Sequence, residues 1–270
     1  MEKSQRSNTS ILIIYVIVSY SVTWVILFPL SLVYNELNLV QRELWHASGA
    51  IGPTIGALIA LYLFRQKEGL KLLKNRILKY SGRNLLIFAF SPIIILIIVL
   101  LIESLLGVFD LNSFFAENTI MNTGSFILFI LPSVSYGFFE EIGWRGCLLP
   151  ALQEKYNALI STLILTVIWW FWHFPTFFYR FDLIFGFVLM FPLMLSGSIV
   201  LSFLFNQARG SILMVIILHT CYDLVTSHQI SITAIIIVST FYVFMNVRIL
   251  KIYGIENFST YEKITLRNNI

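Results

Sequence analysis

Long stretches without a charged residue dominate this sequence. Seven of them approach or exceed the roughly 20 residues with which a helix crosses a bilayer, and an eighth is interrupted only by His219 and Asp223. A chain of 270 residues that is 58% hydrophobic, 12% charged and has a mean hydropathy of +0.84 is too apolar for a soluble domain. We therefore predict an all-α, polytopic membrane helix bundle with about eight transmembrane helices. The expected spans are 7–35, 47–64, 84–102, 118–139, 156–172, 183–206, 210–228 and 229–247.

Basic residues are divided unevenly between the two sides of this predicted bundle. With a cytoplasmic N-terminus, all of the 18 Lys and Arg residues except Arg42 and Arg180 fall on the cytoplasmic side, as the positive-inside rule requires. Segment 65–83 alone carries seven basic residues against Glu68, which is typical of a topology anchor at an anionic leaflet rather than of a nucleic-acid site. We predict a multi-pass protein of a bacterial-type plasma membrane, with both termini cytoplasmic and no nucleic-acid partner.

No soluble domain interrupts the pattern of spans. We expect a single integral membrane domain over residues 1–250 and a polar, peripheral cytoplasmic tail over residues 251–270. The first apolar run is too long for the h-region of a cleavable signal peptide and is interpreted as the first span. Cys147 and Cys221 lack C-x-x-C spacing and predict neither a disulfide framework nor a thiolate metal site.

Six ionisable residues occupy positions where a lipid-facing helix should carry none. Charged groups at membrane depth are costly, usually face the bundle interior and mark functional sites. All six come from three segments, and they are Glu140, Glu141, Arg145, His173, His219 and Asp223.

The first segment contains a carboxylate with a partner and one without. In a helix, Glu141 and Arg145 share one face, one turn apart, and can form a buried ion pair. Glu140 points about 100° away from Glu141 and is left unneutralised, which suits a general base acting on water. A helix end at the cytoplasmic interface, where Glu and Arg are ordinary, is the alternative interpretation of this segment.

Two histidine segments complete the set. His173 follows three tryptophans within five residues, which form either an interfacial belt with a snorkelling histidine or the wall of a dry cleft. His219 and Asp223 share one helix face, so the carboxylate can fix the tautomer of the ring, although a structural hydrogen bond between helices is also possible. His46 and His228 lie at predicted outer boundaries and are interpreted as incidental.

Together these groups are those that amide hydrolysis requires: water, a glutamate base, a histidine partner and donors for an oxyanion. A catalytic zinc held by Glu140, His173, His219 and Asp223 is the alternative mechanism, but the H-E-x-x-H pattern is absent and no cofactor is favoured. A proton- or ion-coupled transporter would use similar residues, yet no internal repeat is found. A non-catalytic immunity or scaffold protein is the third hypothesis.

The same residues resemble the CPBP intramembrane endopeptidases, the CAAX-protease and bacteriocin-processing family also called Abi. The resemblance covers roughly residues 133–223, and each of its motifs lies on a separate predicted helix. Two positions depart from the usual pattern, since Trp169 replaces a Phe and Asp223 stands where Asn is frequent. The matching motifs are Glu140-Glu141-x-x-x-Arg145, Trp169-x-x-x-His173 and His219-x-x-x-Asp223.

This resemblance implies an eight-helix enzyme whose site lies within the membrane, opens towards the cytosol and cleaves membrane-associated peptides of CAAX or bacteriocin-leader type. It implies that Glu140 and His173 activate water and that His219 and Asp223 stabilise the oxyanion or orient the substrate. Glu141 and Arg145 would then be supporting residues. A rise of about 1.5 Å per residue places Glu140 and His173 at different depths, so tilt, re-entry or shifted helix boundaries must bring them together.

Overall fold

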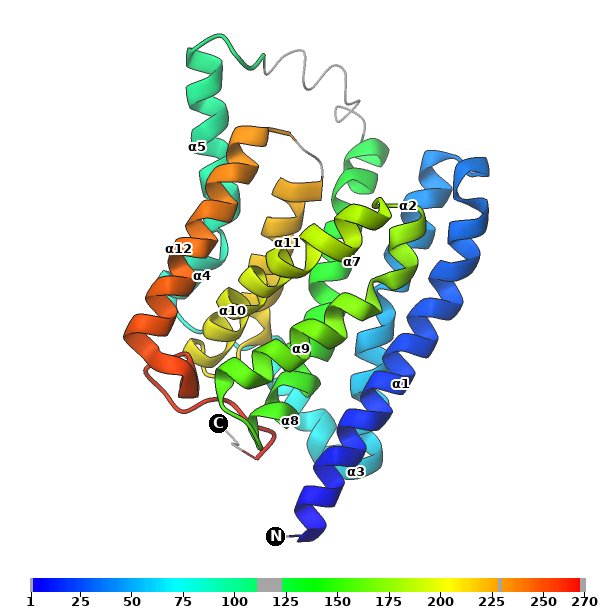
Figure 1. Cartoon of the computed structure of the whole chain (residues 1–270), viewed down its shortest axis with the longest axis vertical. Coiled ribbons are helices and arrows are strands. Elements are labelled where there is room, and N and C mark those ends of the chain that lie inside the picture. Colours follow the sequence, from blue (N-terminus) through cyan, green and yellow to red (C-terminus); the bar gives the residue numbers. More distant parts are fainter. Residues whose placement is uncertain (1, 111–122, 228–229, 268–270) are drawn as a thin grey trace.

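The computed structural model describes residues 2–110, 123–227 and 230–267, and within these ranges it consists of helices and loops without a β-strand (Figure 1). In chain order the elements are α1 (Glu2–Val33), η1 (Tyr34–Glu36), α2 (Leu39–Gly49), α3 (Ile51–Ile77), α4 (Arg83–Ala89), α5 (Ser91–Leu105), α7 (Thr123–Gly143), the π-helical turn η2 (Trp144–Leu148), α8 (Leu149–Gln153), α9 (Ala158–Trp172), η3 (Phe174–Phe178), the π-helical turn η4 (Phe185–Leu189), α10 (Met190–Gln207), α11 (Ile212–Ser227) and α12 (Ile232–Asn257).

Every predicted span corresponds to a helical segment, which confirms the polytopic helical bundle. In the described ranges, five helical segments are long and apolar enough to cross a membrane, and they contain α1, α2 with α3, α7 with α8, η4 with α10, and α12. The pair α4 and α5, bent by 58°, makes a sixth. The remaining two, α9 and α11, are shorter apolar helices. The chain is therefore an integral membrane protein.

Two predicted boundaries are wrong in ways that matter for the site. Helix α3 continues to Ile77, so most of the basic segment 65–83 is helical rather than a loop, with a kink at Gln66 (φ 51°, ψ −141°). Helix α7 continues through η2 into α8 as one apolar segment, Phe126–Gln153. Glu140 consequently lies near the middle of this segment and not at the end of a span, and its side chain is buried inside the bundle.

Close packing on both sides fixes helix α7, which carries Glu140. A Cβ at Gly137 would lie 2.9 Å from the backbone nitrogen of Thr220 on α11, and a Cβ at Gly143 would lie 2.7 Å from the carbonyl carbon of Pro53 on α3. Only glycine permits such close approach of backbones. The two glycines therefore let α7 lie tightly between α3 and α11, and Glu140 lies between them in the sequence.

The two ends of the bundle differ in charge. The basic end consists of residues 65–83, 153–157 and 258–267, and the N- and C-terminal labels of Figure 1 lie near it. Arg65 Nη2 pairs there with Glu154 Oε1 at 3.2 Å. The far end consists of residues 34–46, 179–184 and 230–232, and it includes the ring contact between Tyr34 and Tyr179 at 4.9 Å.

The C-terminal tail covers the basic end and is not peripheral, which corrects the sequence-based expectation. Phe258, Ile264 and Leu266 are 0%, 3% and 1% exposed. The fully buried Asn206 donates to the carbonyl oxygen of Asn257 at 2.8 Å and accepts from the backbone N–H of Ile264 at 3.2 Å. The tail is polar in sequence but buries alternate apolar residues, a pattern too short to register as a span.

Further backbone groups of the tail accept hydrogen bonds from buried side chains of other helices. Gln153 Nε2 donates to the carbonyl oxygen of Ile264 at 2.7 Å, and Arg76 Nη2 donates to that of Thr265 at 2.8 Å. These bonds fix the tail against α3 and α8. We call residues 258–267 the tail strap.

Replacing Asn206 by alanine is expected to loosen the tail strap, because it leaves the Asn257 carbonyl and the Ile264 N–H without this partner. Buried groups left in this way cost about 1–3 kcal/mol each. In limited proteolysis with trypsin we expect cleavage after Lys263 to accelerate about 10-fold. The exposed Asn84→Ala variant is the control and should match wild type. Equal cleavage rates in both variants would contradict this role of Asn206.

Candidate active site

A cavity of about 620 Å³ lies among α7, α9, α10, α11 and α12, and it brings the predicted catalytic residues together. Glu140 comes from the middle of the α7 segment, His173 from the residue that ends α9, and His219 and Asp223 from α11. All four line the cavity. Glu141 and Arg145 are 0% exposed and lie behind this lining.

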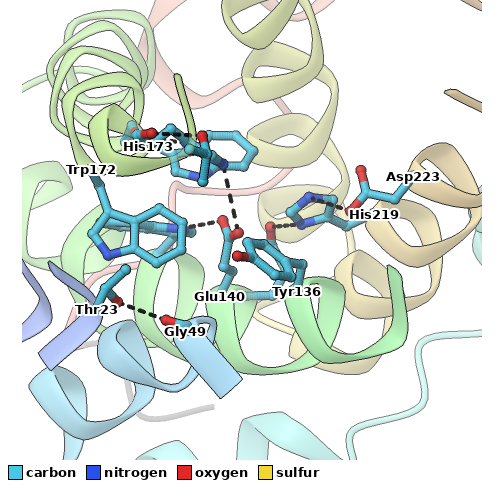
Figure 2. A network of polar contacts seen from close by, with 12 residues as sticks. Thr23, Gly49, Tyr136, Glu140, Trp172, His173, His219 and Asp223 are labelled. Atoms are coloured by element: carbon cyan, nitrogen blue, oxygen red, sulfur yellow. Dashed lines mark hydrogen bonds and ion pairs between the residues drawn. The ribbon is translucent and has the colours of Figure 1, made fainter. Parts of the chain in front are cut away.

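Glu140 uses its two oxygens differently (Figure 2). Oε2 accepts a 2.8 Å hydrogen bond from Trp144 Nε1, one helical turn further along. Oε1 accepts no hydrogen bond from the described residues and lies 4.0 Å from His173 Nε2. Trp144 thus holds the carboxylate in place, and the second oxygen is left for a group that enters the cavity.

His173 is held by the end of its own helix. Its Nδ1 lies 2.9 Å from the carbonyl oxygen of Trp169, and because a carbonyl only accepts, Nδ1 must carry the proton. In the neutral ring Nε2 is then an acceptor, and this is the nitrogen that faces Glu140. Helix α9 ends at Trp172, so the depth difference between Glu140 and His173 is closed by a short helix together with the extended α7 segment.

Trp169 lines the cavity, and Trp172 packs against His173 without lining it, so these two rings are buried and do not form an interfacial belt. Trp169 and Trp172 are 5% and 0% exposed, and their rings lie 5.9 Å and 4.9 Å from the ring of His173. Trp169 also contacts the ring of His219 edge-on at 5.4 Å. Its substitution for the usual Phe keeps an aromatic ring in the lining. The interpretation of His173 as a snorkelling residue is therefore wrong.

Behind the cavity, a chain of polar contacts links α7 to α11. Arg145 Nη1 pairs with Glu141 Oε1 at 2.7 Å, as the spacing predicted. The same oxygen lies 2.8 Å from His219 Nδ1, a contact that the sequence did not predict because it joins two helices. His219 Nε2 lies 3.5 Å from Asp223 Oδ2, one turn along α11. Glu141 therefore orients His219 from behind, while Nε2 and Asp223 face the cavity.

Comparison with known proteins indicates what the chain is similar to. Residues 122–225 match the family described as type II CAAX prenyl endopeptidase Rce1-like. The chain is also 26% identical over 191 residues to the CAAX prenyl protease 2 of Methanococcus maripaludis, in an alignment that covers 65% of this chain and 69% of that protein. The match confirms the resemblance to the CAAX-protease (CPBP) family. Both similarities support an intramembrane protease.

The site includes residues that were not predicted from the sequence. His46, interpreted as incidental, lines the cavity and stacks on Tyr136, with ring centroids 4.7 Å apart. Tyr179 lies with its hydroxyl 2.7 Å from His46 Nδ1, and burial raises the pKa of Tyr179 so that this hydroxyl stays protonated. Tyr136 was predictable, since it lies one turn before Glu140 on the same helix face. His228 lies outside the described residues.

The described donor groups of this site do not form a zinc site in their observed arrangement. Within the described ranges, no three His, Cys, Asp or Glu side chains come close enough together to hold a metal ion. A catalytic zinc needs about three protein ligands. His219 also uses Nδ1 to contact Glu141, which leaves it a single nitrogen for any ligand.

The cavity reaches the far end of the bundle, which bears on an expectation drawn from the CPBP resemblance. Its lining includes Arg180, Phe181 and Asp182 after η3, and Thr226 and Ile232 where α11 and α12 meet the far end. The cavity and the basic segment therefore face opposite ends of the bundle. For this reason the prediction that the site opens to the cytosol is incompatible with the prediction that the basic end lies in the cytoplasm.

Proposed function

We propose that this protein is an intramembrane endopeptidase that hydrolyses a peptide bond of a membrane-associated polypeptide, using a water molecule activated by Glu140 and His173. One observation carries the proposal. Glu140 Oε1, which accepts no hydrogen bond from the described residues, faces His173 Nε2 at 4.0 Å inside a cavity that Trp169 also lines. A carboxylate and an imidazole placed in this way can bind one water between them and remove its proton.

The separation of the two acceptors suits one water molecule. Glu140 Oε1 and His173 Nε2 are 4.0 Å apart. A water oxygen that forms a hydrogen bond of about 2.8 Å to each of them would have an angle of about 90° between the two bonds. This angle is close to the angle between the two O–H bonds of water. Both protons then point at protein acceptors, and a lone pair is left for the substrate carbonyl. Glu140 takes one proton as the oxygen attacks, and that proton passes to the leaving amine.

The second pair of residues would stabilise the charge that develops on the carbonyl oxygen. Glu141 accepts from His219 Nδ1 and fixes the ring, so that Nε2–H of the doubly protonated ring can donate to the oxyanion. Asp223 is the carboxylate nearest to Nε2. We assign it the role of orienting His219, since an ionised Asp has no proton to donate.

The proposed substrates are membrane-associated peptides. The curated relative is a CAAX prenyl protease by name, and the family resemblance also includes processing of bacteriocin leader peptides. The apolar walls of the cavity, with Leu193 and Met194 of α10 and Ile235 of α12, favour substrates with apolar residues near the scissile bond. The lipid bilayer is the second proposed partner, and no nucleic acid is expected.

Cleavage of membrane-anchored peptides tests this proposal. Purified protein in liposomes is given a library of fluorogenic peptides that carry one apolar anchor. We expect cleavage, with two products whose combined mass exceeds that of the substrate by one water molecule. The variant His173→Gln should lose about 10²-fold or more of the rate, since positioned general-base partners contribute that much. Intact peptides throughout the library would overturn the proposal.

A strong chelator is expected to leave the rate unchanged within twofold, because the proposed reaction uses no metal. The measurement is the initial rate of the best peptide after prolonged incubation with the chelator, and a zinc protease treated in parallel shows that metal is removed. Loss of activity that added zinc restores would instead favour a metal bound by Glu140, His173, His219 and Asp223.

A further inference from the structure

The mouth of the active-site cavity lies at the far end of the bundle. Arg180, Phe181 and Asp182 line it on the loop that follows η3, and Ile232 lines it at the start of α12. Asp182 is exposed and Ile232 is 70% exposed. Arg180 Nη1 is paired with Glu43 Oε1 of α2 at 2.8 Å, which holds this loop at the far end. A polypeptide can therefore approach Glu140 from this end.

The opposite approach, from the basic end, is blocked. Trp144, Arg145 and Leu148, which follow Glu140 in η2, are each 0% exposed. Below them α8 is buried along its whole length. The tail strap then covers α8, with Ile264 and Leu266 buried at 3% and 1% exposure. Several layers of packed side chains therefore separate the catalytic groups from the basic end.

The distribution of charge assigns the two ends to the two sides of the membrane. All Lys and Arg residues of the chain except Arg42, Arg180 and the buried Arg145 belong to the basic end or to the segments that lead to it. Helix α3 carries the basic residues of 65–77 to that end, and Arg42 and Arg180 lie at the far end. A bias of this size in short loops places the basic end in the cytoplasm. The mouth of the cavity then faces the outer side.

We propose that the site takes its substrates from the outer face of the membrane. These substrates are exported polypeptides that are anchored by an apolar segment, and their scissile bond enters the site from the outer leaflet. The inference rests on the proposed proteolytic function. The walls of the cavity fit this class of substrate, because Met190, Leu193 and Met194 offer an apolar surface beside the mouth. An anchored segment can pack there while the adjacent polar residues reach Glu140 through the mouth.

Accessibility of single cysteines tests the orientation without relying on activity. Cys147 and Cys221 are free and buried, and both are replaced by alanine. Asp182→Cys then marks the mouth and Lys67→Cys, also an exposed position, marks the basic end. A membrane-impermeant maleimide added to intact cells should label the Asp182→Cys variant and should label the Lys67→Cys variant only after permeabilisation. The reverse pattern would overturn the proposal.

Sealed membrane vesicles test the side of cleavage with the wild-type protein. We expect right-side-out vesicles to cleave an added anchored peptide at least 10-fold faster than inverted vesicles. Faster cleavage by inverted vesicles would overturn the proposal. The cysteines could be labelled as expected while neither kind of vesicle nor the detergent-solubilised protein cleaves the peptide. This result would count against the proteolytic function and not against the orientation. Failure of the proposed function and failure of the proposed orientation are therefore distinguishable.

Discussion

Replacing Glu140 by glutamine is expected to lower kcat by about 10³-fold, the middle of the range for loss of a general base, while the protein stays folded. Glutamine has nearly the same shape, and its carbonyl oxygen can still accept the hydrogen bond from Trp144 Nε1. It cannot take a proton from water. The measurement is the initial rate of cleavage of an anchored peptide over a range of concentrations, with KM expected to change little, together with a melting curve in detergent.

The exposed Glu68, at the basic end, provides the matched control. Glu68→Gln makes the same chemical change far from the cavity and should retain the wild-type rate. If Glu140→Gln kept more than a tenth of the wild-type kcat, the assignment of Glu140 as the base would be wrong. A lower melting temperature for this variant would instead indicate that the carboxylate is needed for packing.

Replacing Arg145 by alanine is expected to lower the free energy of unfolding by about 3–5 kcal/mol, because it leaves the buried carboxylate of Glu141 without its arginine partner. Both side chains are 0% exposed and their ion pair is 2.7 Å long. The substitution also removes the contact of the guanidinium with the ring of Trp169 at 5.0 Å. Unfolding by a denaturing detergent, followed by circular dichroism, measures the change.

Two further variants separate the ion pair from a general effect of removing arginine. The exposed Arg83→Ala variant should unfold as wild type does. The double variant Glu141→Leu/Arg145→Met should recover part of the lost stability, since it leaves no unpaired charge from this pair. It should nevertheless remain inactive, because His219 Nδ1 loses the oxygen that orients it. A stable Arg145→Ala variant would show that Glu141 does not depend on its partner.

Local spacing predicted the parts of the site that lie on one helix. Residues four apart share a helix face and can contact each other. This spacing accounts for the contact of Glu141 with Arg145 and for that of His219 with Asp223. Each apolar run likewise corresponds to a helical segment, whereas the short helices α2 and α8 lie almost wholly outside the predicted spans. In both cases the information is local, since helix periodicity and bilayer thickness act on a few turns of chain at a time.

Contacts between segments far apart in the sequence could not be predicted in this way. The contact between Glu141 and His219 depends on how α7 packs against α11. The contact between His46 and Tyr136 depends on how α7 packs against α2. No local spacing specifies this packing. The extension of α7 past Glu140 was missed for a related reason, because buried charges were taken as the end of a span. Burial inside the bundle, with Glu141 paired to Arg145, makes these residues compatible with the middle of a membrane-spanning segment.

The tail strap also has a consequence for biogenesis. It contacts α3, α8 and α10, all of which are synthesised before it. Until it emerges, Gln153 and Asn206 can pair with each other but lack the backbone groups of Ile264 that it later supplies. Membrane insertion of the spans can therefore precede completion of the fold, and a chain arrested within α12 would lack the hydrogen bonds that close its basic end.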